Sequence, residues 1–437
     1  MTLLKDDATY LWHPYRQEKN NTPLLPIVRG KGTVLYAEDG REYLDLVSSW
    51  WVNTHGHAHP KIAQAIADQA HTLEQVLFSD GTHPTAVTLA KQLVALLPDP
   101  LTRIFYSDNG STAVEVALKM AYQYWYNRDQ PERRRFIGFE GAYHGDTFGA
   151  MAAGKSSGFY RPFESFLFEV DRIPYPETWD QDDDVKTKEA YALDVLDQHL
   201  LVHGSQTAAL IIEPLIQGAS GMRFCRPEFL RQVVEKVRAH GILVIFDEVM
   251  TGFGRTGALF ASQKAGVDPD LICLAKGLTG GFLPLSVTAV REEIYEAFLG
   301  DTFEKAFAHG HSFAANPLGC AAALACLSLF EEEKTLDKIQ EMETVHRHHM
   351  GQLTSHPTLG DKLSQGRVMG SIAAINMSVG EAYGSSFSRV LKQKFFDNGL
   401  FLRPLGSIIY LMPPYCTTQD QLDESYGKIT RILLEMG

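Results

Sequence analysis

The sequence predicts an α/β protein with a large mixed, mostly parallel sheet and a smaller α+β unit near its C-terminus. Short apolar runs alternate with longer helical patterns through most of the chain, which is the order of elements that produces a parallel sheet covered on both faces. The chain has 437 residues, of which 45% are hydrophobic. This is enough material for two lobes, each with its own core.

Strand and helix patterns follow one another from the N-terminus onward. The first strands fall in TVLYAEDGREYLDL, where a turn at Asp39 and Gly40 reverses the chain. Helices follow at residues 60–73 and 83–97, and the strand RIFYSD then leads into the helical pattern GSTAVEVALKMAYQYW. Further strands are expected in RRRFIGFEG, TAALIIEP, ILVIFDE and DLICLAK, and a further helix in PEFLRQVVEKVRAHG.

The pattern changes from about Ala321 onward, where a long helix is followed by the strand GSIAAINMS, another helix, the run GLFLRPLGSIIYLMPPY and a closing helix. We therefore divide the chain into an N-terminal segment at residues 1–55 that packs with the small domain, a large domain at residues 56–325 and a C-terminal small domain at residues 326–437. The acid-rich stretch TWDQDDDVKTKEAY interrupts the large domain, and we interpret it as a solvated insertion.

Charge and composition argue against several classes of function. The formal net charge is -13 and the sequence has no basic block, which argues against binding of nucleic acid or of an anionic membrane surface. The N-terminus carries KDD where a signal peptide needs apolar residues, and CAAALACLSLF is too short to cross a bilayer, so a cytoplasmic protein is expected. The cysteines lack C-x-x-C spacing, and His55, His57 and His59 have no acid or cysteine cluster beside them, so no metal site is expected.

Lys276 ends the apolar run DLICLAK, and Asp247 ends the run ILVIFD. Alone, such a lysine is more often a solvated strand terminus, and such an aspartate a helix cap or an ion-pair partner. A partly desolvated lysine, however, favours the neutral amine that attacks carbonyls and forms Schiff bases. If Lys276 holds pyridoxal phosphate, Asp247 pairs with the pyridinium nitrogen and keeps it protonated. The two residues then explain each other.

A phosphate site is expected where YSDNGSTAVEVALKM passes from a strand into a helix. The N–H groups of Gly110 and Ser111, a hydroxyl of Ser111 or Thr112 and the helix dipole together favour a dianion. The alternative is an ordinary helix start near Thr112, with Glu115 completing a capping box, and both can hold at once.

The stretch GILVIFDEVMTGFGRTG contains the spacing G-x-G-x-x-G, which is also found in nicotinamide-binding proteins. In those proteins an acidic residue follows the next strand, whereas here the acids precede that strand and Lys276 follows it. The order argues against a nicotinamide cofactor. We interpret the glycines as a loop that passes close to a bound cofactor or a partner subunit, with Arg255 pairing nearby.

These motifs resemble the pyridoxal-phosphate aminotransferases of fold type I, in the class III or omega-aminotransferase branch. The resemblance covers nearly the whole chain, and AYHGDTFGAM, IIEPLIQGASGM and DEVMTGFGRTG carry it. LWHPY, SSWW and RPLGSIIYLMPPY are most similar to those members that aminate 8-amino-7-oxononanoate to 7,8-diaminononanoate in biotin synthesis, with S-adenosylmethionine as amino donor. The resemblance implies the fold of a type I pyridoxal-phosphate-dependent transferase, a ping-pong mechanism and a homodimer with sites at its interface.

The resemblance also implies roles for individual residues. Lys276 would form the Schiff base with pyridoxal 5'-phosphate and then move the proton, Asp247 would hold the pyridinium, and Tyr143 and Val249 would contact the two ring faces. Ser312 would reach the phosphate from the second subunit, although related enzymes that use adenosylmethionine carry Pro-Thr at positions 311 and 312. The implied cofactor-binding residues are Gly110, Ser111, Tyr143, Asp247, Val249, Lys276, His311 and Ser312, and the catalytic ones are Lys276, Asp247 and Tyr143.

The implied substrate site leaves alternatives open. Arg403 would bind the substrate carboxylate, and Trp50 and Tyr15 would form flat walls, although core packing or simple exposure explains the same residues equally well. The proline in GGFLPLSVT is typical of class III enzymes in general, so lysine remains an alternative donor, and another omega-amino-acid or amine transaminase an alternative activity. A non-catalytic relative is disfavoured because it would be expected to lack Lys276 or Asp247. The implied substrate-binding residues are Tyr15, Trp50, Tyr143, Lys276, Gly310, Arg403 and Tyr410.

Overall fold

A seven-stranded sheet forms the centre of the molecule, which we describe from a computed structural model for residues 3–20, 23–154, 158–378 and 385–436. The strand order is β4-β12-β11-β10-β7-β5-β6. Neighbours from β11 to β6 run parallel, whereas β12 is antiparallel to β11 and to β4. The predicted α/β class with a mixed, mostly parallel sheet is confirmed, although β12 was not among the expected strands. The strands are β4 (Leu101–Ser107), β5 (Arg135–Phe139), β6 (Asp171–Ile173), β7 (Thr207–Ile212), β10 (Leu243–Asp247), β11 (Leu271–Leu274) and β12 (Ser286–Arg291).

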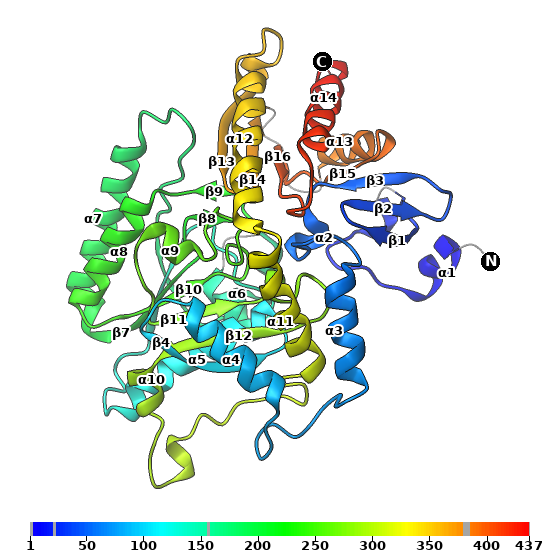
Figure 1. Cartoon of the computed structure of the whole chain (residues 1–437). Coiled ribbons are helices and arrows are strands. Elements are labelled where there is room, and N and C mark those ends of the chain that lie inside the picture. Colours follow the sequence, from blue (N-terminus) through cyan, green and yellow to red (C-terminus); the bar gives the residue numbers. More distant parts are fainter. Residues whose placement is uncertain (1–2, 21–22, 155–157, 379–384, 437) are drawn as a thin grey trace.

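Apolar side chains cover both faces of this sheet. In β10, Leu243 and Ile245 belong to the core under α5, while Val244 and Phe246 belong to the core under α8. Successive side chains of a strand point to opposite faces, so a strand buried on both sides reads as one apolar run. Figure 1 shows the helices gathered around the sheet. They are α3 (Pro60–Ala70), α4 (Pro84–Leu96), α5 (Gly110–Asn127), α6 (Phe148–Gly154), α7 (Val185–His203), α8 (Pro227–Ala239), α9 (Ala261–Ala265), α10 (Glu292–Glu296) and α11 (Pro317–Glu332).

The start of α5 differs from the one expected. The helix begins at Gly110, because the Asn109 side chain accepts a hydrogen bond from the Thr112 N–H and the Thr112 hydroxyl accepts one from the Asn109 N–H. The expected capping box between Thr112 and Glu115 is therefore wrong. Glu115 instead accepts hydrogen bonds from two N–H groups in the first turn of α6.

The acid-rich stretch is only in part the solvated insertion that we expected. The helix α7 begins within it, at Val185, directly after Asp184. Lys188 of α7 donates hydrogen bonds to the Asp182 carboxylate and to the Glu177 carbonyl. The acids before Val185 lie at a helix N-terminus, where the helix dipole stabilises negative charge.

Residues from both ends of the chain form a four-stranded sheet, in which β15 runs parallel to β3 with Leu400 opposite Leu44. A three-stranded sheet packs beside it against α12, above the large sheet in Figure 1. The domain boundaries at residues 55 and 325 stay a prediction. The strands are β1 (Ile27–Lys31), β2 (Val34–Ala37), β3 (Glu42–Asp45) and β15 (Leu400–Phe401) in the first sheet and β13 (Leu363–Met369), β14 (Ile372–Met377) and β16 (Ile408–Leu411) in the second.

The other elements lie mostly near the two chain ends. Within the residues described, no helix combines the length and the apolar composition that a membrane span requires. The elements are α1 (Leu3–Tyr10), α2 (Ser48–Trp51), α12 (Thr335–Thr354), α13 (Ser386–Asp397), α14 (Gln419–Glu435) and a small hairpin of β8 (Ile216–Gln217) and β9 (Arg223–Phe224).

Arg255 joins the N-terminal segment, the large domain and the C-terminal segment. Its guanidinium donates hydrogen bonds to the carbonyls of Trp51, Asn53 and Pro413 at 3.0–3.3 Å, and only 1% of the residue is exposed. Because Trp51 and Asn53 belong to the N-terminal segment and Pro413 to the C-terminal one, this contact orients the two ends of the chain against the large sheet.

Of the two roles expected for the glycines around Arg255, contact with a cofactor is not borne out, and contact with a partner subunit stays a prediction. Gly252, Gly254 and Gly257 lie outside the residues that line the large cavity described below. Gly254 and Gly257 have φ of 95° and 93°, which a glycine adopts without strain. A Cβ on Gly254 would lie 2.7 Å from Ile339, so the loop packs closely against α12 and not against a cofactor.

We expect Arg255→Met to lower the free energy of unfolding by about 3 kcal/mol or more, because it leaves buried carbonyl groups without donors. Arg41→Met is the control, since Arg41 is exposed and bonds to its neighbour Asp39 in a turn, and a change within about 0.5 kcal/mol is expected there. Urea unfolding followed by circular dichroism measures both. Equal effects of the two substitutions would contradict the role given to Arg255.

Candidate active site

The carboxyl ends of β7, β10 and β11 open into a cavity of about 1060 Å³. Asp247 is the last residue of β10, Lys276 lies two residues after β11, and Gly110 and Ser111 begin α5. The far wall comes from both ends of the chain and contains Tyr15, Trp50, Val47, Arg403 and Tyr410. Ligands of open α/β sheets bind at this edge, outside the carboxyl ends of the strands.

Asp247 is held rigidly at the base of the cavity. One carboxylate oxygen, Oδ2, lies 2.7 Å from Nδ1 of His144, and the other accepts the Val249 N–H at 3.0 Å. Both Asp247 and His144 are buried. An ionised carboxylate can only accept, so the imidazole carries its proton on Nδ1. Asp247 therefore supplies a fixed negative charge inside the cavity.

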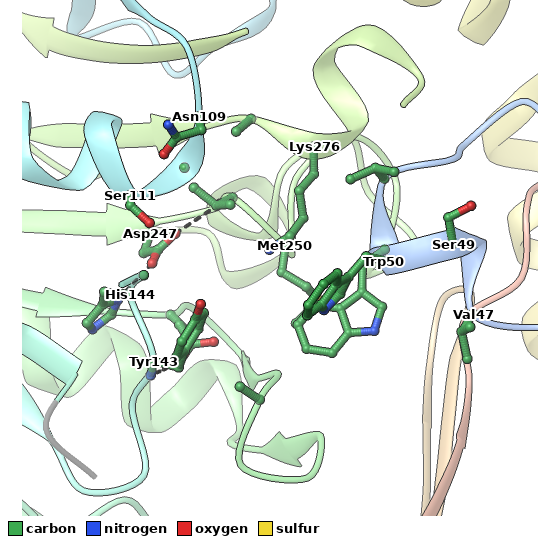
Figure 2. Close-up of a pocket in the computed structure, with 18 of the residues that line it drawn as sticks. Val47, Ser49, Trp50, Asn109, Ser111, Tyr143, His144, Asp247, Met250 and Lys276 are labelled. Atoms are coloured by element: carbon green, nitrogen blue, oxygen red, sulfur yellow. Dashed lines mark hydrogen bonds and ion pairs between the residues drawn. The ribbon is translucent and has the colours of Figure 1, made fainter. Parts of the chain in front are cut away.

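Lys276 reaches into the cavity between its two walls. Figure 2 shows Ser111, Asp247, His144 and Tyr143 on one side and Trp50 on the other. The lysine Nζ lies 5.2 Å from the centroid of the Trp51 ring. Burial lowers the pKa of its ammonium, while the carboxylates of Asp247 and Glu213 raise it. A lysine with a lowered pKa provides more of the neutral amine that attacks carbonyls.

The start of α5 forms a cradle for an anion. Gly110 and Ser111 present N–H groups of the first turn, which have no acceptor within the helix and carry the positive end of its dipole. A Cβ on Gly110 would lie 2.6 Å from Val249 Cγ1, so the backbone and the Val249 side chain approach each other more closely than any other residue type allows. The Asp146 N–H donates to Ser111 Oγ at 3.2 Å, which fixes that hydroxyl.

Two tyrosines meet at one carboxylate. The hydroxyl groups of Tyr15 and Tyr143 donate to the same oxygen of Asp146, at 2.5 and 3.1 Å. Burial, together with the hydrogen bond to Asp146, raises the pKa of Tyr15 to about 12. Both rings therefore stay neutral at physiological pH, and Asp146 links Tyr143 on one wall of the cavity to Tyr15 on the other.

The opposite wall is aromatic with one cation. Trp50 packs edge to face against Tyr15 at 5.8 Å between ring centroids, and the Arg403 guanidinium carbon lies 5.4 Å from the Trp50 ring. Beneath it, the Trp51 indole N–H donates to the Tyr410 hydroxyl at 3.0 Å. A flat apolar surface that ends in a guanidinium suits an aliphatic chain with a terminal carboxylate.

The segment that carries both tryptophans is strained and held by a buried carboxylate. Ser48, Ser49 and Trp51 have φ of 49°, 60° and 66°, which non-glycine residues rarely adopt. Asp45 accepts hydrogen bonds from the N–H groups of Val47 and Ser49 and from His57. Strain of this kind persists only when the surrounding contacts outweigh it.

The structure does not bring every predicted residue into this cavity. Gly310, His311 and Ser312 lie outside its lining. His311 Nε2 is 4.0 Å from the Asp108 carboxylate, and the Ser312 carbonyl accepts a hydrogen bond from the Gln75 side chain. The role predicted for Ser312 places it in a second subunit, so its contribution to the phosphate stays a prediction.

Two buried ionisable residues of the described cavity lining, His144 and Glu213, were not singled out from the sequence. His144 directly follows Tyr143 in AYHGD, and nothing local marks it as the partner of Asp247. Glu213 follows β7 as Asp247 ends β10, so its place at the end of TAALIIEP was a usable signal. Burial raises the pKa of the Glu213 carboxyl to about 7, and the neighbouring His144 opposes this shift.

Comparison with known proteins assigns the family. The family model for class III aminotransferases matches residues 15–433. The adenosylmethionine-8-amino-7-oxononanoate aminotransferase of Synechococcus elongatus is 51% identical, over 98% of this chain and 99% of its own. The chain belongs to the class III aminotransferases.

Solved structures of class III aminotransferases have the same fold. The adenosylmethionine-8-amino-7-oxononanoate aminotransferase of Methanocaldococcus jannaschii superposes with a TM-score of 0.90 at 34% identity, with 98% of each chain covered. A pyridoxal-phosphate-bound amine transaminase from an uncultivated Pseudomonas species gives 0.88 at 30% identity, over 98% of this chain and 99% of its own. The expected fold type I architecture and the aminotransferase class are confirmed.

Pyridoxal 5'-phosphate is the cofactor of class III aminotransferases, and membership in the class confirms the cofactor that was predicted. The residues of this cavity fit it. The N-terminal turn of α5 suits a phosphate, the carboxylate of Asp247 suits a pyridinium, and the amine of Lys276 suits an aldehyde. A cavity of about 1060 Å³ has room for the cofactor together with a substrate.

Proposed function

We propose that the chain transfers an amino group to 8-amino-7-oxononanoate, forming 7,8-diaminononanoate, with S-adenosylmethionine as donor. The observation that carries the proposal is that one cavity joins Lys276 and Asp247 to a wall of Trp50, Tyr15 and Arg403. This combination pairs a site for amino transfer with a long apolar wall that ends in a cation. Relatives over nearly the whole chain that are named for this reaction support the assignment.

The cofactor, when bound, supplies a carbonyl that exchanges amino groups and a conjugated ring that takes up electrons as a substrate proton leaves. Asp247, held by His144, keeps a negative charge beside the ring nitrogen. Gly110 and Ser111 hold the phosphate through the N–H groups of α5. Lys276 Nζ would accept the proton from the substrate carbon and pass it to the former carbonyl carbon of the cofactor, which requires the neutral amine that burial favours.

The substrate residues orient the ketone. Arg403 binds the terminal carboxylate, and burial lowers the pKa of its guanidinium without making it neutral. Trp50 and Tyr15 cover the aliphatic chain and exclude water, and Tyr410 supports them through the Trp51 indole. The same aromatic faces accommodate a sulfonium donor through cation–π attraction. One site thus serves both halves of a ping-pong reaction.

The assembly belongs to the same proposal. We infer a homodimer with two-fold symmetry, in which Gly310, His311 and Ser312 of each chain complete the site of the other. Support comes from three exposed apolar side chains, Leu77, Phe303 and Phe313. The Gln75 side chain bonds to the Ser312 carbonyl, which brings the segments of Leu77 and Phe313 together on one surface. A cytoplasmic location without nucleic acid or membrane partners stays a prediction.

The amino donor is tested by absorbance. Protein loaded with cofactor is expected to lose its yellow band with S-adenosylmethionine and to regain it with 8-amino-7-oxononanoate, because the amino group moves to the cofactor and on to the ketone. Loss of the yellow band with lysine alone, in a separate cuvette, would identify lysine as the donor and leave the proposed product unchanged. Recovery only with other keto acids would refute the proposed substrate. Lys276→Ala should abolish both changes, and Lys236→Ala, on the surface of α8, should leave them intact.

We expect Arg403→Gln to raise KM for 8-amino-7-oxononanoate about 10- to 100-fold, because a charge-assisted hydrogen bond to a carboxylate contributes about 1.5–3 kcal/mol. The half-reaction with the donor should change far less. Arg389→Gln on α13, outside the cavity, is the control. Steady-state kinetics against both substrates measure the difference, and an equal loss for donor and acceptor would remove Arg403 from its assigned role.

The shared site is tested with mixed dimers. Ser312→Ala and Lys276→Ala chains are each expected to bind cofactor more weakly, by about tenfold for the serine, since one hydrogen bond to a charged group is lost. In a heterodimer of the two, one site would carry both changes and the other none. Cofactor titration should therefore recover one site of wild-type affinity per dimer. Two weakened sites would show that Ser312 serves its own chain, and a monomer of 48.7 kDa in sedimentation would refute the dimer.

A further inference from the structure

Glu213 is a buried carboxylate that lines the cavity, and the proposed reaction assigns it no role. It follows the last residue of β7, and β7 lies next to β10, which ends in Asp247. β11 lies on the other side of β10 and leads to Lys276. Three neighbouring parallel strands thus place three ionisable side chains at one edge of the sheet, and all three line the cavity.

The Glu213 carboxylate joins two segments of the cavity wall. Oε1 accepts the N–H of Tyr143 at 3.0 Å, and Oε2 accepts the N–H of Gly218 at 2.9 Å. A Cβ on Gly218 would lie 3.0 Å from the end of Met250 and 3.2 Å from the Trp51 ring, so the second segment packs closely beneath the indole. Glu213 therefore ties the backbone of Tyr143 to the surface that carries Trp51.

The charges around Glu213 come from several elements. The charges of His144 and Asp247 shift the pKa of Glu213. The pKa of Lys276 depends on the carboxylates of Glu213 and Asp247 and on the cation of Arg255. Burial and the charge of Asp247 raise the pKa of Glu213, while His144 and the two N–H donors lower it. With a pKa of about 7, the Glu213 carboxylate is ionised above neutral pH.

We propose that Glu213 is a positioning residue that fixes Tyr143 through its backbone and that, when ionised, holds the proton on Lys276. The negative charge stabilises the ammonium over the neutral amine, so Glu213 sets how readily Lys276 accepts and releases a proton. The catalytic part of this proposal rests on the proposed function, in which Lys276 moves the substrate proton. The electrostatic part concerns the chain without cofactor.

Glu248 provides a control, because it is also a buried glutamate whose two oxygens accept backbone N–H groups, but it lies outside the cavity. It is buried, and its two oxygens accept the N–H groups of Ala261 and Ser262 at 2.6 and 2.8 Å. Burial raises its pKa to about 7 as well. It caps α9 and lies outside the cavity lining. A general effect of removing a buried carboxylate should therefore appear equally in Glu213→Gln and Glu248→Gln.

The test is the pH dependence of acetylation of Lys276 by acetic anhydride in the full chain freed of cofactor, measured by mass spectrometry. Glu213→Gln is expected to lower the pKa of Lys276 by about 1 unit, because it removes a nearby negative charge. Glu248→Gln should leave the pKa of Lys276 unchanged. Glu213→Asp keeps a carboxylate at this position, so it should keep the pKa of Lys276 near its original value. No shift, or an equal shift in both glutamine variants, would overturn the proposal.

A second measurement leaves Glu213 in place. Coupling between two titrating groups is reciprocal, so Lys276→Met should raise the pKa of Glu213 by about the same 1 unit. In the Glu248→Gln background, the infrared carboxyl band of 13C-labelled glutamate follows Glu213 near neutral pH, and an unchanged titration would overturn the proposal.

In the cofactor-loaded chain, Glu213→Gln should likewise lower the pH at which the absorbance band of the bound cofactor titrates. Absence of that band would refute the proposed function and leave the acetylation result standing.

Discussion

The hydrogen bond between Asp247 and His144 is the contact about which the cavity is arranged. It holds a carboxylate at the end of a fully buried strand, where an unpartnered charge would be too costly to keep. Around it, the parallel order of β7, β10 and β11 brings Glu213 and Lys276 to the same edge. The cavity therefore places two carboxylates beside one lysine and one imidazole, and the pKa of Lys276 depends on burial, on both carboxylates and on the cation of Arg255.

The opposite wall depends on a different set of contacts. The segment from Ser48 to Trp51 is strained, and Asp45 and Arg255 hold it through backbone groups while leaving its aromatic side chains to face the cavity. Arg255 also binds the carbonyl of Pro413, so one side chain of the large domain contacts both chain ends that form this wall. The sequence TGFGRTG thus serves packing between lobes, not contact with the cofactor. Its likeness to a nucleotide-binding motif arises because Gly254 and Gly257 adopt positive φ beside the buried arginine and Gly252 lies close to the Glu248 carbonyl.

Much of the fold follows from local pattern. Continuous apolar runs identify β7, β10 and β11 because both faces of these strands are buried, and the acid or lysine at their ends marks the edge where ligands bind. The helix after β4 was recognisable because a strand leads directly into it, but its start was placed near Thr112 and not at Gly110. Its cap was assigned to the wrong residue, since Asn109 and Thr112 both suit a helix N-terminus and only the backbone geometry selects between them.

By itself the sequence determined the fold class and the residues at the strand ends, because these follow from the order and pattern of local segments, and the resemblance of its motifs to a known family gave the cofactor. Only the tertiary structure decided that His144 partners Asp247 and that Glu213 links Tyr143 to Gly218, because these contacts join residues up to 103 positions apart. The same holds for the approach of Trp50, Tyr15 and Arg403, which come from opposite ends of the chain. Such contacts depend on how the strands and lobes are packed, and no local pattern of residue types encodes that packing.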